Sequence, residues 1–165
     1  MTNISIMDNK DYTNIILEIF QEICKIPHPS GQEEAIGDYL MAFAKAHGLK
    51  AKKDNVGNIL ICKAAAKGCE KSPTVILQAH QDMVCEKDAA LIHDFMKQPI
   101  QTYIEDGWLK AKGTTLGADD GIGMAMMLAV LADSTLKHGP IEALFTVSEE
   151  TGLTGASNQI GRAHV

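Results

Sequence analysis

Three short stretches of the sequence carry residues that could bind metal ions together. The first is His80, with Asp82 two residues later, directly after the apolar run 75–77. In an extended chain, residues i and i+2 point to the same side, so this imidazole and this carboxylate can share one site. The other stretches are two turns rich in carboxylates: residues 117–121, with Asp119 and Asp120, and residues 148–152, with Glu149 and Glu150.

These carboxylates would repel one another if they met in one place. Two like charges 4 Å apart cost about 4 kcal/mol at an effective dielectric constant near 20. The nearest basic residues in the sequence are Lys87 and Lys112, so a divalent cation is the natural counter-charge. One imidazole with several carboxylates suits zinc, manganese or cobalt better than calcium, which prefers oxygen ligands.

Each stretch also has a purely structural explanation. A histidine such as His80 is often a hydrogen-bonded core residue. Asp119 and Asp120 open an expected helix, where the helix dipole favours carboxylates in any case. Glu149 and Glu150 would be ordinary in a solvated loop. From spacing alone, two hypotheses therefore remain: these residues form a metal site, or each has a purely structural role.

Strands and helices alternate along the chain, which predicts an α/β fold. The run 75–77 predicts a strand covered on both faces. The spacing Ser30-x-x-Glu33 predicts a capping box at the start of a helix. The elements expected are helices at 11–24, 30–47 and 120–132, strands at 58–62, 74–79 and 141–147, and a hairpin at 100–110 around Asp106-Gly107.

Composition excludes several classes of function. The chain has 165 residues, enough for one domain with a core, and 45% of them are hydrophobic. A net charge of -6 without a basic cluster argues against nucleic-acid binding. No apolar run reaches the length of a membrane span, and the polar residues 1–12 do not resemble a secretion signal. Four cysteines without a C-x-x-C pair indicate free thiols in a reducing cytoplasm.

Three motifs, in this order, resemble those of the co-catalytic zinc dipeptidase/aminoacylase family of metallopeptidases. They are His80-Gln81-Asp82-Met83-Val84, residues 113–123 (GTTLGADDGIG) and Ser148-Glu149-Glu150-Thr151-Gly152. Their wording is most similar to the aminoacyl-histidine dipeptidases, also called cytosolic non-specific dipeptidases. Residues 26–31 and 93–95 are similar to that subfamily too, and the resemblance covers about residues 11–157.

The resemblance implies a fold and a domain organisation. The expected fold is a three-layer catalytic domain with a central mixed sheet between helices, incomplete in this chain. Residues 1–158 would be the N-terminal portion of that domain, and the lid domain would be absent. Residues 159–165 have no periodicity, and we expect them to be a non-native tail.

The resemblance also implies roles for single residues. His80 would bind one of two divalent metal ions, Asp119 would bridge both, and Glu150 would bind the second. Asp82 would orient His80 from behind, and Glu149 would be the general base. Zinc is the expected metal, with manganese and cobalt as alternatives. The family pattern further implies a cis peptide bond between Asp119 and Asp120.

The activity implied is hydrolysis of dipeptides, both Xaa-His and broad-specificity, by a metal-activated water in the cytoplasm. The full-length form would be a homodimer, without nucleic-acid or membrane partners. In the family each metal has one more protein ligand, and neither has a counterpart here, so we expect the 165-residue chain to be inactive. Two alternatives remain: a deacylase or tripeptidase of the same family, and a non-catalytic metal-binding fragment.

Overall fold

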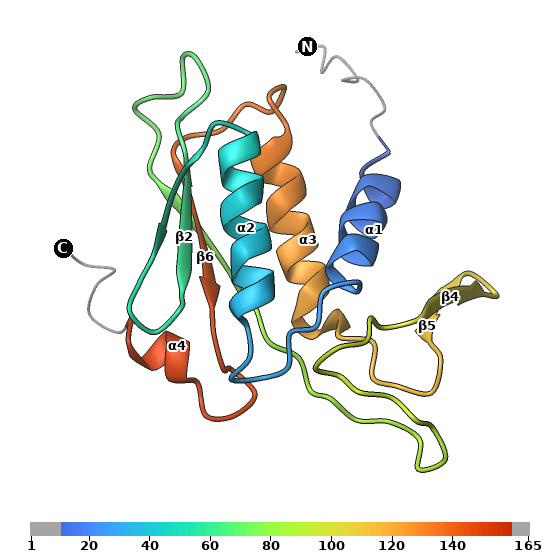
Figure 1. The fold of residues 1–165 in the computed structure, drawn as a ribbon. Helices are drawn as coiled ribbons and strands as arrows, with labels where there is room; N and C mark the ends of the chain where they lie inside the picture. Colours follow the sequence, from blue (N-terminus) through green and yellow to red (C-terminus); the bar gives the residue numbers. More distant parts are fainter. Residues whose placement is uncertain (1–10, 160–165) are drawn as a thin grey trace.

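The computed structural model describes residues 11–159, which form a mixed sheet, a layer of helices and a separate hairpin (Figure 1). The predicted α/β class is confirmed. Among these residues no helix is both long and apolar enough to cross a bilayer. Of the expected tail, 159–165, only Gln159 belongs to the described residues. The elements are α1 (Tyr12–Ile23), α2 (Glu34–Ala46), β1 (Lys50–Lys53), β2 (Ile59–Lys63), β3 (Val75–His80), β4 (Thr102–Glu105), β5 (Trp108–Ala111), α3 (Ala118–Ala132), β6 (Ile141–Thr146) and α4 (Thr154–Ser157).

The main sheet has the strand order β1-β2-β6-β3. β6 pairs antiparallel with β2 and parallel with β3, which confirms the mixed sheet. In the parallel pair, His80 lies opposite Thr146. The carboxyl ends of β3 and β6 therefore lie side by side, and the chain leaves both at the same edge of the sheet.

Helices α2 and α3 lie over one face of this sheet, and α1 lies on the same side, beyond α3 (Figure 1). Their apolar stripes supply Phe20, Leu40 and Leu128 to a core that also contains Ile59 and Phe145 of the strands. α1 packs directly against α3. A β carbon built on Gly121 of α3 would lie 2.7 Å from Phe20 Cε2, so the two helices approach this closely because residue 121 is glycine.

The prediction that residues 75–77 are covered on both faces is wrong. Val75 and Ile76 are 49% and 52% exposed, and Leu77 is half-buried. β3 is the last strand of the sheet, and no helix among residues 11–159 covers the second face. An apolar run shows only that a strand can be buried on both faces by other elements. Whether cover is present depends on the rest of the fold.

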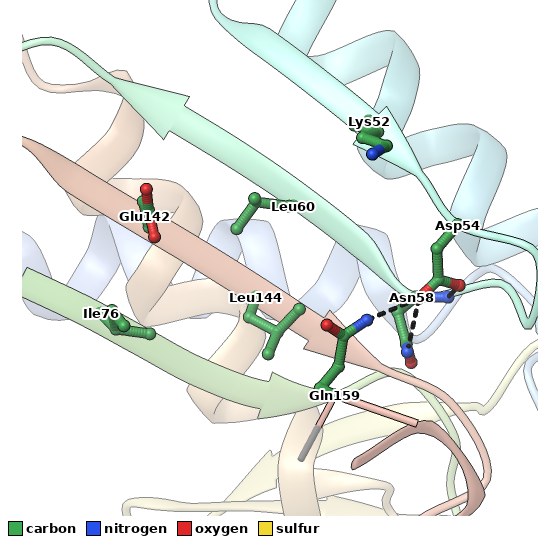
Figure 2. Close-up of a pocket in the computed structure, with 8 residues that line it drawn as sticks. All are labelled: Lys52, Asp54, Asn58, Leu60, Ile76, Glu142, Leu144 and Gln159. Atoms are coloured by element: carbon green, nitrogen blue, oxygen red, sulfur yellow. Dashed lines mark hydrogen bonds between the residues drawn. The ribbon is translucent and has the colours of Figure 1, made fainter. Parts of the chain in front are cut away.

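The second face of the sheet is visible in Figure 2, with the helices behind it. Leu60 of β2, Leu144 of β6 and Ile76 of β3 form an apolar row across it. Together with polar residues at its rim, this row lines a shallow pocket. None of the predicted metal ligands lines that pocket, so the candidate site lies elsewhere.

The predicted capping box is also wrong. α2 begins at Glu34, three residues later than a cap at Ser30 requires, and no side chain caps its first turn. The hydroxyl of Ser30 instead donates a hydrogen bond to Asp82 Oδ2 at 2.6 Å. Glu33 accepts hydrogen bonds from Ser148. The side chains of Ser30 and Glu33 therefore form hydrogen bonds with residues that are distant in sequence, which the local pattern could not show.

Candidate metal centre

Three elements end or begin at the edge of the sheet where β3 and β6 terminate. His80 is the last residue of β3, and Asp82 follows it. Asp119 lies in the first turn of α3, which packs against β3. Glu150 comes shortly after β6. The parallel pairing of β3 with β6 therefore explains why residues 70 positions apart meet.

The predicted metal ligands do lie together. His80, Asp119 and Glu150 each offer one ligand atom, and these atoms all lie within 4.8 Å of one another. His80 is buried, whereas Asp119 and Glu150 are exposed, so the cluster opens to solvent on one side. An imidazole and two carboxylates at this spacing fit a divalent transition metal in both ligand type and distance.

His80 is held at both ring nitrogens. Nδ1 lies 2.9 Å from the carbonyl oxygen of Asp82 and 3.3 Å from its Oδ1, and Nε2 lies 3.0 Å from Asp119 Oδ1. Burial alone would lower the pKa of His80, but the hydrogen bonds to Asp82 and Asp119 outweigh it and raise this pKa to about 9. In the metal-free protein the imidazole is therefore protonated at neutral pH, and its Nε2 points at the other ligands.

Asp82 is buried and connects several parts of the site. Its Oδ1 accepts a hydrogen bond from the backbone N–H of Glu149 at 3.0 Å, and its Oδ2 accepts one from that of Glu150 at 3.2 Å. Burial would raise the pKa of Asp82, but the bonds from His80, Ser30 and the two amides hold it below its usual range. The carboxylate is therefore ionised and fixed behind His80.

Asp119 and Asp120 differ in their surroundings. The peptide bond between them is cis, as the family pattern implies, and neither residue has helical backbone angles. The side chain of Asp119 is 85% exposed and turned toward His80. Asp120 Oδ1 accepts a hydrogen bond from the Gly123 backbone at 3.2 Å. Burial raises the pKa of Asp120, and its carboxylate caps the regular part of α3.

The segment of residues 148–150 turns sharply after β6. Ser148 has a left-handed backbone with a φ of +51°, which is uncommon outside glycine. Glu150 brings its carboxylate to the cluster. Glu149 is half-buried and contacts the site through its backbone N–H. Its carboxylate does not belong to the group of metal-ligating atoms, which leaves the predicted base role to be tested.

Two residues that contact the site were not predicted there. Ser30 contacts Asp82, and Glu33 contacts Ser148. Their spacing is a visible signal, but it predicts a helix cap because that is the usual local use of a serine three residues before a glutamate. Their partners lie 52 and 115 residues away in sequence, so only the fold reveals them.

The model of peptidase family M20/M25/M40 matches residues 76–164. This match covers the predicted motifs from β3 onward. The cytosol non-specific dipeptidase of Escherichia coli is 55% identical over 139 residues, which are 84% of this chain and 29% of the relative. The chain therefore belongs to the M20/M25/M40 peptidase family.

Two solved structures are similar over most of the chain. The aminoacylhistidine dipeptidase of Vibrio alginolyticus has a TM-score of 0.85 and 48% identity, and the alignment covers 90% of this chain and 31% of that one. A tripeptidase of Staphylococcus aureus has a TM-score of 0.72 and 28% identity, and the alignment covers 87% of this chain and 39% of the tripeptidase. This chain thus spans about three-tenths of the length of the two dipeptidases.

Proposed function

We propose that this chain is the N-terminal part of a metal-dependent dipeptidase that hydrolyses Xaa-His and other dipeptides. The observation that carries this proposal is the meeting of His80, Asp119 and Glu150 at one edge of the sheet. The similarity to the E. coli and V. alginolyticus dipeptidases supports the substrate class. A cytoplasmic location and a homodimeric full-length form belong to the same proposal, and the name of the E. coli protein supports the location.

Two divalent metal ions would be held by three side chains. His80 would bind one ion, Glu150 the other, and Asp119 would bridge both. Zinc is the proposed metal, with manganese and cobalt as alternatives. When bound, the ions would lower the pKa of a water and neutralise charge developing on the peptide oxygen. The observed ligand types and their spacing fit this role.

The protein's own groups would move the proton and keep the geometry. Glu149 would take a proton from the water that attacks the peptide carbonyl and pass it to the leaving amine. Asp82 would hold His80 through Nδ1, so that Nε2 faces the metal. The same Asp82 fixes the backbone of Glu149 and Glu150. These two residues would have different roles because successive side chains leave a turn in different directions.

A tripeptidase is the second candidate, because the S. aureus tripeptidase is 28% identical with a TM-score of 0.72. The test is an assay of the metal-loaded full-length protein on dipeptides that include Xaa-His, on tripeptides and on N-acyl amino acids. We expect dipeptides to be cleaved fastest. Faster cleavage of tripeptides or N-acyl amino acids would reassign the substrate class to a tripeptidase or a deacylase.

The base is tested in the same assay. Glu149→Gln should lower kcat by about 10²–10⁴-fold, the usual contribution of general acid–base catalysis. Glu18→Gln, on the exposed side of α1, is the control and should leave kcat unchanged. Metal binding without hydrolysis of any substrate would favour the non-catalytic alternative, and an unchanged kcat of Glu149→Gln would remove Glu149 from the mechanism.

A further inference from the structure

We propose that Ser30 and Glu33 are positioning residues that hold segment 148–150 against the end of β3. Both precede α2, and neither belongs to the cluster of metal-ligating atoms. Their contacts reach the segment by two separate routes, one through Asp82 and one directly. The consequence for metal binding rests on the proposed function, whereas the holding of the segment does not.

The first route runs from Ser30 through Asp82. The Ser30 hydroxyl donates to Asp82 Oδ2 at 2.6 Å, and the same oxygen accepts the Glu150 amide at 3.2 Å. Asp82 is only 1% exposed, so water does not replace a lost donor easily. Ser30 therefore fixes the rotation of the carboxylate that receives the amides of Glu149 and Glu150.

The second route runs from Glu33 to Ser148. Glu33 Oε1 accepts both the backbone N–H and the hydroxyl of Ser148, each at 2.9 Å. Ser148 is the residue with the left-handed φ of +51°, a conformation that persists in a non-glycine residue only when its surroundings hold it. Bonds to a charged acceptor are stronger than neutral ones, so the Glu33 carboxylate is well suited to hold this turn.

Together, the two routes bond three successive backbone amides, those of residues 148, 149 and 150, to two carboxylates. The amide of Ser148 is bound by Glu33, and the next two are bound by Asp82. Because Asp82 also contacts His80, the backbone of Glu150 is placed relative to the imidazole before any metal binds. Ser30 and Glu33 are thus the residues that connect the start of α2 to the geometry of the candidate metal centre.

The direct test is hydrogen exchange at the amides of Ser148, Glu149 and Glu150 in the metal-free 165-residue chain, measured by NMR. Ser30→Ala and Glu33→Ala should speed exchange at these amides at least about tenfold, while the amides of β6 stay unchanged. Ser30→Thr keeps the hydroxyl and Glu33→Gln keeps an acceptor oxygen, so both should restore most of the protection. The matched controls are Ser157→Ala and Glu34→Gln, which change exposed residues of the same types.

Zinc titration of the same variants is the second readout. Ser30→Ala and Glu33→Ala should weaken zinc affinity by about 10–100-fold, the usual effect of losing a group that orients metal ligands. Unchanged exchange at the three amides in both alanine variants would overturn the proposal. So would faster exchange with unchanged zinc affinity, because the segment would then not place the ligands.

The two proposals can fail separately. If the unsubstituted chain binds no zinc, yet the alanine variants show faster exchange that Ser30→Thr and Glu33→Gln reverse, the positioning role is supported and the metal centre is not. If an alanine variant does not fold, hydrogen exchange in Glu33→Gln and Ser30→Thr still tests the proposal. Protection of amides 148–150 close to that of the unsubstituted chain in these two variants supports the proposal, because each keeps the hydrogen-bonding atom. Complete loss of this protection with the β6 amides unchanged contradicts it.

Discussion

The imidazole of His80 and the carboxylate of Asp119 are in direct contact, with Nε2 3.0 Å from Oδ1. On the other side of the ring, Nδ1 lies 2.9 Å from the Asp82 carbonyl oxygen. With acceptors at both nitrogens the protonated ring is favoured, and the pKa of His80 is raised to about 9. A metal ion bound through Nε2 would take the place of that proton, so protons and metal would compete for the same atom.

This competition predicts a pH dependence of metal binding. Between pH 6 and pH 8, below the His80 pKa, the ion that His80 binds should displace one proton from this imidazole. The apparent affinity for Zn²⁺ or Co²⁺ should therefore rise about tenfold per pH unit. Calorimetric titration in buffers of different ionisation enthalpy measures both the affinity and the number of protons released. An affinity independent of pH over this range would contradict the prediction.

The same pKa predicts a pH dependence of stability in the metal-free chain. The folded pKa of His80 lies above the ordinary value of 6.5, so its contribution to stability is complete below about pH 6.5. This contribution should be lost as the pH rises through about 9. The free energy of unfolding, measured in urea at pH 6, 7, 8 and 9, should fall more steeply than in His80→Gln, which has no proton to lose.

Asp82→Asn should weaken both the fold and the metal site. The amide keeps the size of the side chain but loses the charge that receives Ser30, Glu149 and Glu150. We expect the free energy of unfolding to fall by about 1–3 kcal/mol, and metal affinity by about 10–100-fold. Asp38→Asn, on the exposed side of α2, is the matched control. Equal behaviour of the two variants in urea denaturation and metal titration would refute the role of Asp82.

Gly121→Ala should separate α1 from α3. The added methyl group would lie 2.7 Å from Phe20 Cε2, closer than the packing allows. Overpacking of this kind costs about 1–3 kcal/mol, which urea denaturation can measure. Phe20→Leu makes room at that position, so the double variant should be less destabilised than the sum of the two single variants. If the losses in the free energy of unfolding of the two single variants simply add in the double variant, the contact between residues 121 and 20 is not the cause of the destabilisation.

Ile76→Lys should reduce self-association of the isolated chain at little cost in stability. Ile76 is 52% exposed on the uncovered face of the edge strand β3, and such edges promote association. The free energy of unfolding should change by less than about 0.5 kcal/mol. Ile61→Lys, on the fully buried side of β2, is the control and should prevent folding because it buries an unpaired charge. Sedimentation of both variants, compared with the unsubstituted chain, checks the prediction.

The sequence alone predicted which residues form the candidate centre. The residue types at positions 80, 82, 119 and 150, with their neighbours, suffice to predict metal ligands and the family, because short motifs record the local chemical requirements of a site. It also predicted that the second helix ends near residue 47 and that a hairpin turns at Asp106-Gly107, since the backbone angles of these turns depend on a few adjacent residues.

The tertiary structure decided which partners each group has and which surfaces are covered. Ser30 and Glu33 fit a helix cap in sequence, but in the fold they bond Asp82 and Ser148, which are far away along the chain. Val75 and Ile76 are apolar, yet they are half exposed, because β3 is the edge strand and no helix among residues 11–159 covers the second face of the sheet. Local patterns record preferences of short segments, whereas long-range hydrogen bonds and burial depend on which segments the whole chain brings together.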